Sequence, residues 1–337
     1  MTEVPPEPPL TWLVGAGGLL GQHVKAALER RGMPWHSPPV PWSRPDEAAA
    51  ALRDAAVGLR AAAGDGPWQL LWCAGAGVTG TSAEAFDVEH EMLRTALEAL
   101  EGSDGVAAGG GSVFLASSAG ALYAGVGAAP YDEASPVLPI SDYGDAKLRA
   151  EETVRQWSLR TGTPALIGRL TNLYGPGQDL AKPQGLVSHL CAAHVSRKPA
   201  QIWVSLDTLR DYIFAPDAAA LIVDAMDRLR VESVAAGQSG HPVPVVIKIL
   251  ATQRAITVGA VLAELRRIFR RRPATVLGSS PTSSLQARNL SVASRVWPEL
   301  DERVLTTFPA GVDATLRDLQ RRHQEAVPRR PRPQAGS

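Results

Sequence analysis

Apolar runs of strand length alternate with helical runs through the first two thirds of the chain. The run at 10–14 is apolar and stops at glycines, and residues 19–32 then carry apolar side chains at helical spacing. The same alternation continues at 46–64 (helical), 68–77, 82–102, 111–120, 141–162 and 164–177. Strands and helices that alternate at these lengths form βαβ units, in which helices cover both faces of a parallel sheet. The sequence therefore predicts an α/β fold with a doubly wound parallel sheet.

The composition argues against a nucleic-acid or membrane partner. The 337 residues include 34 basic and 34 acidic ones, whereas proteins that bind nucleic acids or membrane surfaces usually carry a charge imbalance. No apolar run reaches the roughly 18 residues that span a bilayer, and the N-terminus does not have the pattern of a signal peptide. The two cysteines, Cys73 and Cys191, lie far apart in apolar surroundings. We therefore expect a soluble, cytoplasmic protein without disulfides.

A glycine-rich loop stands between the first predicted strand and the first predicted helix. Its Gly15, Gly18 and Gly21 follow the spacing G-x-x-G-x-x-G. Glycine permits a tight turn and a close approach to a pyrophosphate, and the N-terminus of the following helix presents free N–H groups to the anion. We interpret the loop as a dinucleotide site, with a simple turn as the alternative.

The residues after the second predicted strand bear on the choice of dinucleotide. A site for NAD usually carries an Asp or Glu there, which bonds to the ribose 2′-OH. Residues 32–45 contain no acidic side chain and offer His36, Ser37, Ser43 and Arg44 instead. Because a guanidinium suits a 2′-phosphate, the sequence favours NADP(H) over NAD(H), with Arg44 as the first candidate. A solvated loop position is the alternative for Arg44.

Tyr143 and Lys147 lie four residues apart in the helical run at 141–162, so they share one face of that helix. An ammonium close to a phenol stabilises the phenolate. Such a tyrosine can exchange a proton with a substrate hydroxyl or carbonyl while a nicotinamide exchanges the hydride. The strand at 111–120 carries Ser117 and Ser118 toward its end, at the sheet edge where open α/β folds bind ligands. One of these hydroxyls could hold the reacting oxygen.

Taken together, these motifs resemble the extended short-chain dehydrogenase/reductases, also called the NAD-dependent epimerase/dehydratase family, and in particular its nucleotide-sugar-modifying members. The resemblance runs from about Leu10 to His323 and rests on the order and spacing of short segments. These segments are GAGGLLG, WCAGAG, FLASSAGALYAG, YGDAK, GRLTNLYGPGQ and LRDYIFAPDAA. The resemblance implies an enzyme with a Rossmann-type sheet and a smaller C-terminal substrate lobe.

The resemblance also implies a role for each residue that matches a family motif. Tyr143 is the acid/base, Lys147 binds the nicotinamide ribose and stabilises the phenolate, and Ser118 matches the family's catalytic hydroxyl residue. Asn172 and Arg210 match residues that contact a nucleotide sugar and its diphosphate. The resemblance also implies four further cofactor contacts, which are Leu19, Leu20, Ala74 and Gly75. They join the cofactor-binding residues already named: the three glycines of the loop, Arg44, Tyr143 and Lys147.

Two departures from the family pattern bear on the reaction. Nucleotide-sugar 4,6-dehydratases follow the hydroxyl residue with an Asp-Glu pair, whereas this chain has Ala119 and Gly120, which excludes 4,6-dehydration. Where relatives commonly carry an asparagine near the start of the helix at 82–102, this chain has Glu89 or His90. We expect keto-sugar reduction or 4-epimerisation, between which the sequence does not decide. The alternatives are a reductase of a non-sugar carbonyl and a non-catalytic dinucleotide-binding sensor or scaffold.

The alternation of strands and helices loosens after Gly177, which divides the chain. We expect a dinucleotide-binding domain at 10–176, with parts of 210–250 returning to its sheet, and a substrate-binding lobe at 177–209 and 251–325. The ends at 1–9 and 326–337 have the composition of disordered segments.

The remaining expectations concern partners. By the resemblance, the helices near 83–101 and 142–161 form a homodimer interface, although burial within one chain would explain much of the same apolar pattern. No metal site is expected, because His189, Cys191 and His194 do not converge on one point of a helix.

Overall fold

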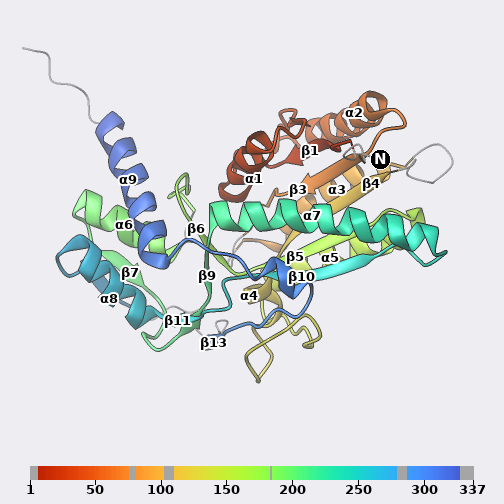
Figure 1. Ribbon diagram of the computed structural model, residues 1–337. Coiled ribbons are helices and arrows are strands. Elements are labelled where there is room, and N and C mark those ends of the chain that lie inside the picture. Colours follow the sequence, from red (N-terminus) through yellow and green to blue (C-terminus); the bar gives the residue numbers. More distant parts are fainter. Residues whose placement is uncertain are drawn as a thin grey trace, which may run out of the picture.

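A six-stranded sheet forms the centre of the protein in a computed structural model, which describes residues 7–75, 77, 81–101, 110–182, 184–278 and 287–326 (Figure 1). All of its pairings are parallel, and its order is β10-β5-β4-β3-β1-β2. The strands are β1 (Leu10–Val14), β2 (Trp35–His36), β3 (Trp68–Trp72), β4 (Gly111–Ser118), β5 (Ala165–Leu170) and β10 (Val245–Leu250). The predicted α/β class with a parallel sheet is confirmed. Most of the two predicted disordered ends, residues 1–6 and 327–337, lies outside the described part of the chain.

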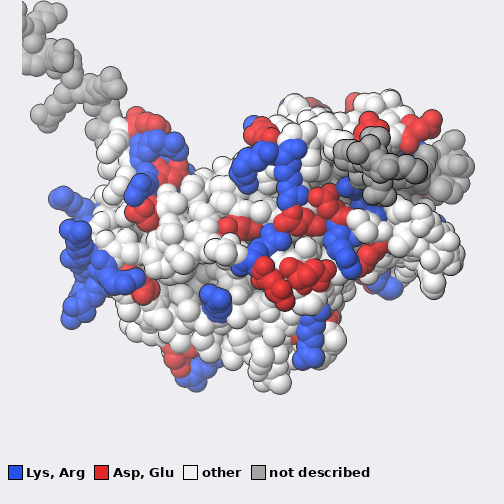
Figure 2. All heavy atoms as spheres, in the orientation of Figure 1, with Lys and Arg blue, Asp and Glu red and all other residues white. Residues whose placement is uncertain are grey.

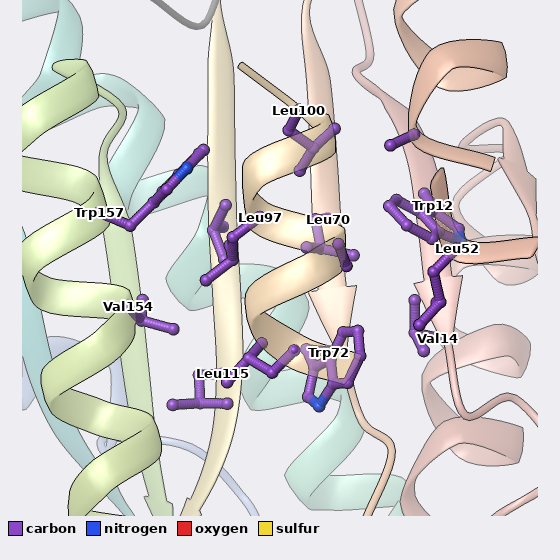
Figure 3. Packing of buried hydrophobic residues seen from close by; sticks show 14 of the residues in the cluster. Trp12, Val14, Leu52, Leu70, Trp72, Leu97, Leu100, Leu115, Val154 and Trp157 are labelled. Atoms are coloured by element: carbon purple, nitrogen blue, oxygen red, sulfur yellow. The ribbon is translucent and has the colours of Figure 1, made fainter. Parts of the chain in front are cut away.

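Helices cover both faces of the sheet because successive strand residues point to opposite sides. Trp12 and Val14 pack under α2 (Pro45–Ala63), α3 (Ala83–Ala99) and α5 (Asp142–Thr161), as Figure 3 shows for part of that cluster. Leu13 packs on the other face, under α1 (Leu19–Arg30) and α7 (Ala215–Gln238). Each buried strand therefore contributes to two apolar layers, which is why the strands read as continuous apolar runs.

The order of the strands reverses at β1, and this reversal predicts where a ligand binds. From β1 the chain first moves outward to β2, and α2 then returns it to β3 on the other side of β1. In open parallel sheets, ligands bind at the carboxyl ends of the strands where the order reverses. The glycine loop after β1 and the segment after β3 lie at this point.

A smaller group of elements follows β5. The helices α6 (Leu186–Ser196), α8 (Val258–Phe269) and α9 (Phe308–Ala326) share a separate apolar cluster with β7 (Ala200–Ile202), which pairs with β12 (Thr275–Leu277). Short strand pairs join this group to the main sheet: β6 (Asn172–Tyr174) with β9 (Tyr212–Phe214), and β8 (Leu209–Arg210) with β11 (Ile256–Thr257) and β13 (Asn289–Leu290). A single turn, α4 (Ala119–Leu122), follows β4.

Charged side chains of both signs lie on the helices that cover one face of the sheet. Acidic and basic side chains are mixed over α1 and α7 (Figure 2), where Arg31 pairs with Asp224 and Asp227. On the other side of the sheet, several large apolar residues of α3 and α5 are buried within the single chain: Phe86, Met92, Leu93, Val154 and Trp157. None of the described helices is long and apolar enough to cross a membrane.

Candidate functional site

A cleft of about 1080 Å³ opens between the carboxyl edge of the sheet and the smaller group of elements. Its walls come from the glycine loop, the ends of β3 and β4, the start of α5, and the segments around β6, α6, β7 and β8. The cleft brings together most of the residues predicted from the sequence: Gly18, Leu19, Leu20, Ala74, Gly75, Ser118, Tyr143, Lys147, Asn172 and Arg210. Residues far apart in the chain therefore share one solvent-accessible volume.

The glycine loop is shaped by close contacts. Gly15 has φ +90°, and a Cβ there would lie 2.6 Å from the backbone nitrogen of Ala74. A Cβ on Gly21 would collide with the carbonyl oxygen of Gly15, so helix α1 can approach the loop only because position 21 lacks a side chain. The helix begins at Leu19. Its first backbone hydrogen bond runs from the Gln22 N–H to the Gly18 carbonyl oxygen, at 3.0 Å. The first turn therefore leaves N–H donors at the cleft for an anion.

A second cavity, of about 430 Å³, lies on the β2 side of the glycine loop. It is lined by Gly15 and Gly17 together with Trp12, Lys25, Trp35, Ser37 and Trp42. The Lys25 ammonium lies 5.0 Å from the centre of the Trp35 ring. The sequence analysis missed Lys25, although it follows Gly21 by one helical turn and so lies on the same face of α1.

Arg44 lies elsewhere. It is the N-cap residue of α2, its side chain is 64% exposed, and its guanidinium pairs with the Glu47 carboxylate at 2.7 Å. Arg44 is not among the residues that line either cavity. Of the two cations, only Lys25 borders the space beside the glycine loop.

Tyr143 and Lys147 lie in the first two turns of α5. The helix begins there because the Ser141 hydroxyl accepts a hydrogen bond from the Gly144 N–H at 3.3 Å. The Lys147 ammonium lies 5.8 Å from the centre of the Tyr143 ring and 3.5 Å from the carbonyl oxygen of Ala116 on β4. Both side chains are half-buried, so the phenol and the ammonium face the cleft together.

The two serines at the end of β4 have different partners. Ser117 is buried, and its hydroxyl donates to the Glu151 carboxylate at 2.5 Å. Ser118 is the N-cap of α4, where its hydroxyl accepts from the Ala121 N–H at 3.3 Å, which leaves its own proton to be donated. Ser118 is therefore the serine whose hydroxyl is available to a reacting oxygen.

A buried ion pair supports this end of the sheet. Arg169 on β5 donates to the Glu151 carboxylate through Nε at 3.0 Å and Nη2 at 2.8 Å, and through Nη1 to the Tyr123 hydroxyl at 2.7 Å. Both charged side chains are 5% exposed. Because Glu151 also binds Ser117, the pair joins α5, β4 and β5 directly behind Ser118. The sequence analysis did not identify this network, whose members lie 18 to 46 residues apart.

The opposite wall of the cleft carries Asn172 and Arg210. The Asn172 side-chain amide donates to the carbonyl oxygen of Asp211 at 2.9 Å, which ties β6 to the start of β9. Asp211 itself is fully buried and accepts hydrogen bonds from Thr171 and Thr252. Since neighbouring strand residues point to opposite sides, this anchoring turns Arg210 toward the cleft.

The Arg210 guanidinium is available to an anion. Burial lowers its pKa from the ordinary value, which reflects the cost of holding this cation away from water. Its guanidinium donates to the carbonyl oxygen of Leu209 at 2.8 Å, and no carboxylate of the described chain pairs with it. Lys182 and Lys198, which the sequence analysis did not single out, line the same cleft.

Comparisons with known proteins point to one family. The family model described as "NAD dependent epimerase/dehydratase family" matches residues 12–237. The chain is 37% identical over 91 residues to a dTDP-L-rhamnose 4-epimerase of Burkholderia thailandensis, which is 27% of this chain and 25% of that protein. It is 30% identical over 105 residues to a dTDP-4-dehydro-6-deoxyglucose reductase of Escherichia coli, which is 31% of this chain and 33% of that protein. The matches thus span about a quarter to a third of these curated relatives.

Solved structures are similar over nearly the whole chain. MoeE5 in complex with UDP-glucuronic acid and NAD gives a TM-score of 0.73 at 20% identity, covering 93% of this chain and 99% of that one. The UDP-glucose 4-epimerase of Thermus thermophilus in complex with NAD gives 0.73 at 18% identity, covering 94% and 100%. At these low sequence identities, the similarity shows that this chain and the solved structures share a fold.

Proposed function

Because the chain belongs to the NAD dependent epimerase/dehydratase family, we propose that it is an NAD(P)-dependent enzyme that acts on a nucleotide sugar by keto-sugar reduction or 4-epimerisation. The observation that carries the proposal is the shared cleft, which the glycine loop, Ser118, Tyr143, Lys147 and Arg210 all line. A dinucleotide fits the loop, since a Cβ on Gly17 would meet no other described residue within 4 Å and the first turn of α1 offers N–H donors. The curated relatives include both an epimerase and a reductase.

The residues of the cleft have complementary tasks in such a reaction. The bound nicotinamide supplies or accepts the hydride. Ser118 donates a hydrogen bond to the reacting oxygen, and Tyr143 gives a proton to a carbonyl oxygen or takes one from a hydroxyl. Lys147 holds positive charge beside the phenol and so stabilises its anionic form. Arg210 and Asn172 bind the diphosphate side of the substrate, because a buried guanidinium without a carboxylate partner pairs well with phosphate oxygens.

Elimination of water has less support than the other two reactions. It requires an acid or base beside the serine, and positions 119 and 120 are alanine and glycine. Ala119 is 2% exposed, and Gly120 lines the cleft without any ionisable group. This arrangement supports reduction or epimerisation over 4,6-dehydration.

For the cofactor we propose NADP(H), with NAD(H) as the alternative. Among the described residues, no Asp or Glu lines the cavity beside the glycine loop, and the cation that lines it is Lys25 rather than Arg44. Two similar structures were solved with NAD, so the preference depends on this chain's own lining residues.

We further propose a cytoplasmic homodimer. Val88 on α3 and Leu159 on α5 are 40% and 50% exposed and could contribute to an interface, whereas the larger apolar residues of these helices are buried within the chain. Sedimentation velocity measures the assembly, and a monomer at micromolar concentration would contradict it.

The test of the proposed activity is turnover of a panel of UDP- and dTDP-linked sugars and keto-sugars with NAD⁺, NADH and NADPH. Tyr143→Phe removes the proton-transferring hydroxyl, and we expect kcat to fall by about 10²- to 10⁴-fold while the dinucleotide still binds. Binding of the dinucleotide with no turnover by the wild type would instead favour a sensor or scaffold.

The same assay examines the substrate class. Arg210→Ala should raise KM for a nucleotide sugar by about 10- to 100-fold, the usual worth of a charge-assisted hydrogen bond. Arg254→Ala, at an exposed position in the same part of the chain, is the matched control. An unchanged KM for Arg210→Ala would favour a substrate without a diphosphate, such as a non-sugar carbonyl compound.

A further inference from the structure

Glu89 and His90, neighbours on α3, have different surroundings. The His90 imidazole lies 2.7 Å from the Thr153 hydroxyl on α5, so it packs between the two helices. Glu89 faces α5, where its carboxylate lies 3.9 Å from the ammonium of Lys147, a residue that lines the cleft. The Glu89 and Lys147 side chains are 27% and 13% exposed. Of the two candidates for the departure from the family's asparagine, Glu89 is the one that lies beside the lysine of the proposed site.

The Glu89 carboxylate joins three separate elements. Its Oε1 faces Lys147 on α5, and its Oε2 accepts from the Gly77 N–H at 3.4 Å, in the segment after β3. Gly75, in the same segment, leaves room for the pair, because a Cβ there would lie 3.3 Å from Oε1 and 3.4 Å from the Lys147 nitrogen. The arrangement depends on a glycine at the edge of the cleft that the sequence analysis assigned to cofactor binding.

An asparagine could hold Lys147 by a hydrogen bond but would leave the lysine's charge intact. A carboxylate at this distance offsets part of that charge, in surroundings that are largely shielded from solvent. The same ammonium lies 5.8 Å from the centre of the Tyr143 ring. The negative charge of Glu89 therefore opposes the effect of Lys147 on the phenol.

We infer that Glu89 is a positioning residue that holds the Lys147 ammonium at the cleft and weakens its stabilisation of the Tyr143 phenolate. The inference rests on the proposed function, which gives Tyr143 the proton transfer. Its consequence is that Tyr143 stays protonated to higher pH than it would beside an uncompensated lysine. The protonated phenol is the form that donates a proton to a carbonyl, so Glu89 favours the reductive direction.

The tyrosines of this chain allow a direct test without substrate. Burial raises the pKa of four of the five tyrosines, Tyr123, Tyr131, Tyr174 and Tyr212. The ultraviolet absorbance of phenolate, measured over a pH series, follows the ionisation of all five tyrosines. Subtracting the curve of the Tyr143→Phe counterpart of each protein isolates the ionisation of Tyr143.

We expect Glu89→Gln to move the Tyr143 midpoint to lower pH by about one unit, because Lys147 then acts without an opposing charge. Glu91→Gln is the matched control: it removes the same charge from the same helix, but from an exposed position where the carboxylate pairs with Arg94. It should leave the midpoint unchanged. An unchanged midpoint in Glu89→Gln, or an equal shift in Glu91→Gln, would overturn the inference.

A second variant keeps the test decisive if Glu89→Gln does not fold. Glu89→Asp retains the charge but withdraws it from Lys147, so the midpoint should move in the same direction by a smaller amount, and an unchanged value counts against the inference. The titration uses no nucleotide sugar. Failure of the sugar panel would therefore contradict the proposed function alone, whereas turnover without a shifted midpoint would contradict the role of Glu89 alone.

Discussion

At the scale of single residues, Lys25 and Arg44 show how the neighbours of a cationic side chain determine whether it can bind a phosphate. The Arg44 guanidinium is already paired with Glu47 and is mostly exposed to water. Lys25 lies over the Trp35 ring at the cavity beside the glycine loop, and its paired carboxylate, Glu29, is 4.0 Å away and half exposed. An ammonium on a flexible stem can leave such a weak pair and reach a phosphate.

Lys25→Ala should therefore weaken the binding of NADPH by about tenfold and leave the binding of NADH nearly unchanged, because only NADPH carries the 2′-phosphate. Arg44→Ala is the matched control and should change neither affinity by more than about twofold. Quenching of the fluorescence of the chain's eight tryptophans on titration with each dinucleotide measures both affinities. Equal losses for NADPH and NADH in Lys25→Ala, or a wild type that prefers NADH, would contradict the NADP(H) proposal.

At the scale of an element, helix α1 depends on its contact with the preceding loop. Gly21 is buried within the helix, and a side chain there would press on the Gly15 carbonyl oxygen. The usual preference of helices for alanine over glycine is therefore reversed at this position. Gly58 in α2 has the opposite surroundings, since it is exposed and a Cβ there would lie within 4 Å of no other residue in the described part of the chain.

The two glycines predict opposite results for the same substitution. Gly21→Ala should lower the free energy of unfolding by about 1–3 kcal/mol through overpacking and should weaken dinucleotide binding. Gly58→Ala should raise the free energy of unfolding by about 0.5–1 kcal/mol, because it restricts the unfolded chain without a clash. Urea unfolding curves of the two variants and the wild type measure both changes. A stabilised Gly21→Ala variant would show that α1 does not need this close approach.

At the scale of the whole molecule, buried polar groups tie distant segments to the sheet. The fully buried Lys248 on β10 donates to the Asp301 carboxylate at 2.9 Å and to the carbonyl oxygen of Val296 at 2.7 Å, which holds the segment before α9. On α1, the His23 imidazole lies 3.0 Å from the carbonyl oxygen of Pro176, after β6. Contacts of this kind make the position of the smaller group of elements depend on groups that titrate.

The histidines predict how stability changes with pH. Burial lowers the pKa of His23, His36, His90 and His194, so below about pH 6.5 the unfolded chain binds more protons than the native one. The free energy of unfolding should therefore fall as the pH is lowered from about 7.5 to about 5.5, and His23 should contribute more than the other three, whose charges are screened by solvent. Urea unfolding at both values measures the fall. His23→Gln should reduce this loss of stability, whereas His241→Gln, at an exposed position, should leave it unchanged. An equal loss of stability in the wild type and both variants would rule out this role of His23.

Local patterns account for the parts of the fold that the sequence predicted. The alternation of apolar strands with helices depends on neighbours two to four residues apart, and it predicted β1, α1 and α5 to within a few residues. It missed α9, although Val312, Leu316 and Leu319 lie at helical spacing and are buried.

The sequence by itself determined the fold class, the glycine loop and the pairing of Tyr143 with Lys147, because each depends on spacing within a single turn or element. Only the tertiary structure separated Ser118 from Ser117, Glu89 from His90 and Lys25 from Arg44. The physical reason is that each choice depends on a partner from another element: Glu151 for Ser117, Lys147 for Glu89, and Trp35 for Lys25. Which of two candidate side chains can act at the site is set by the residues that the rest of the fold brings against them.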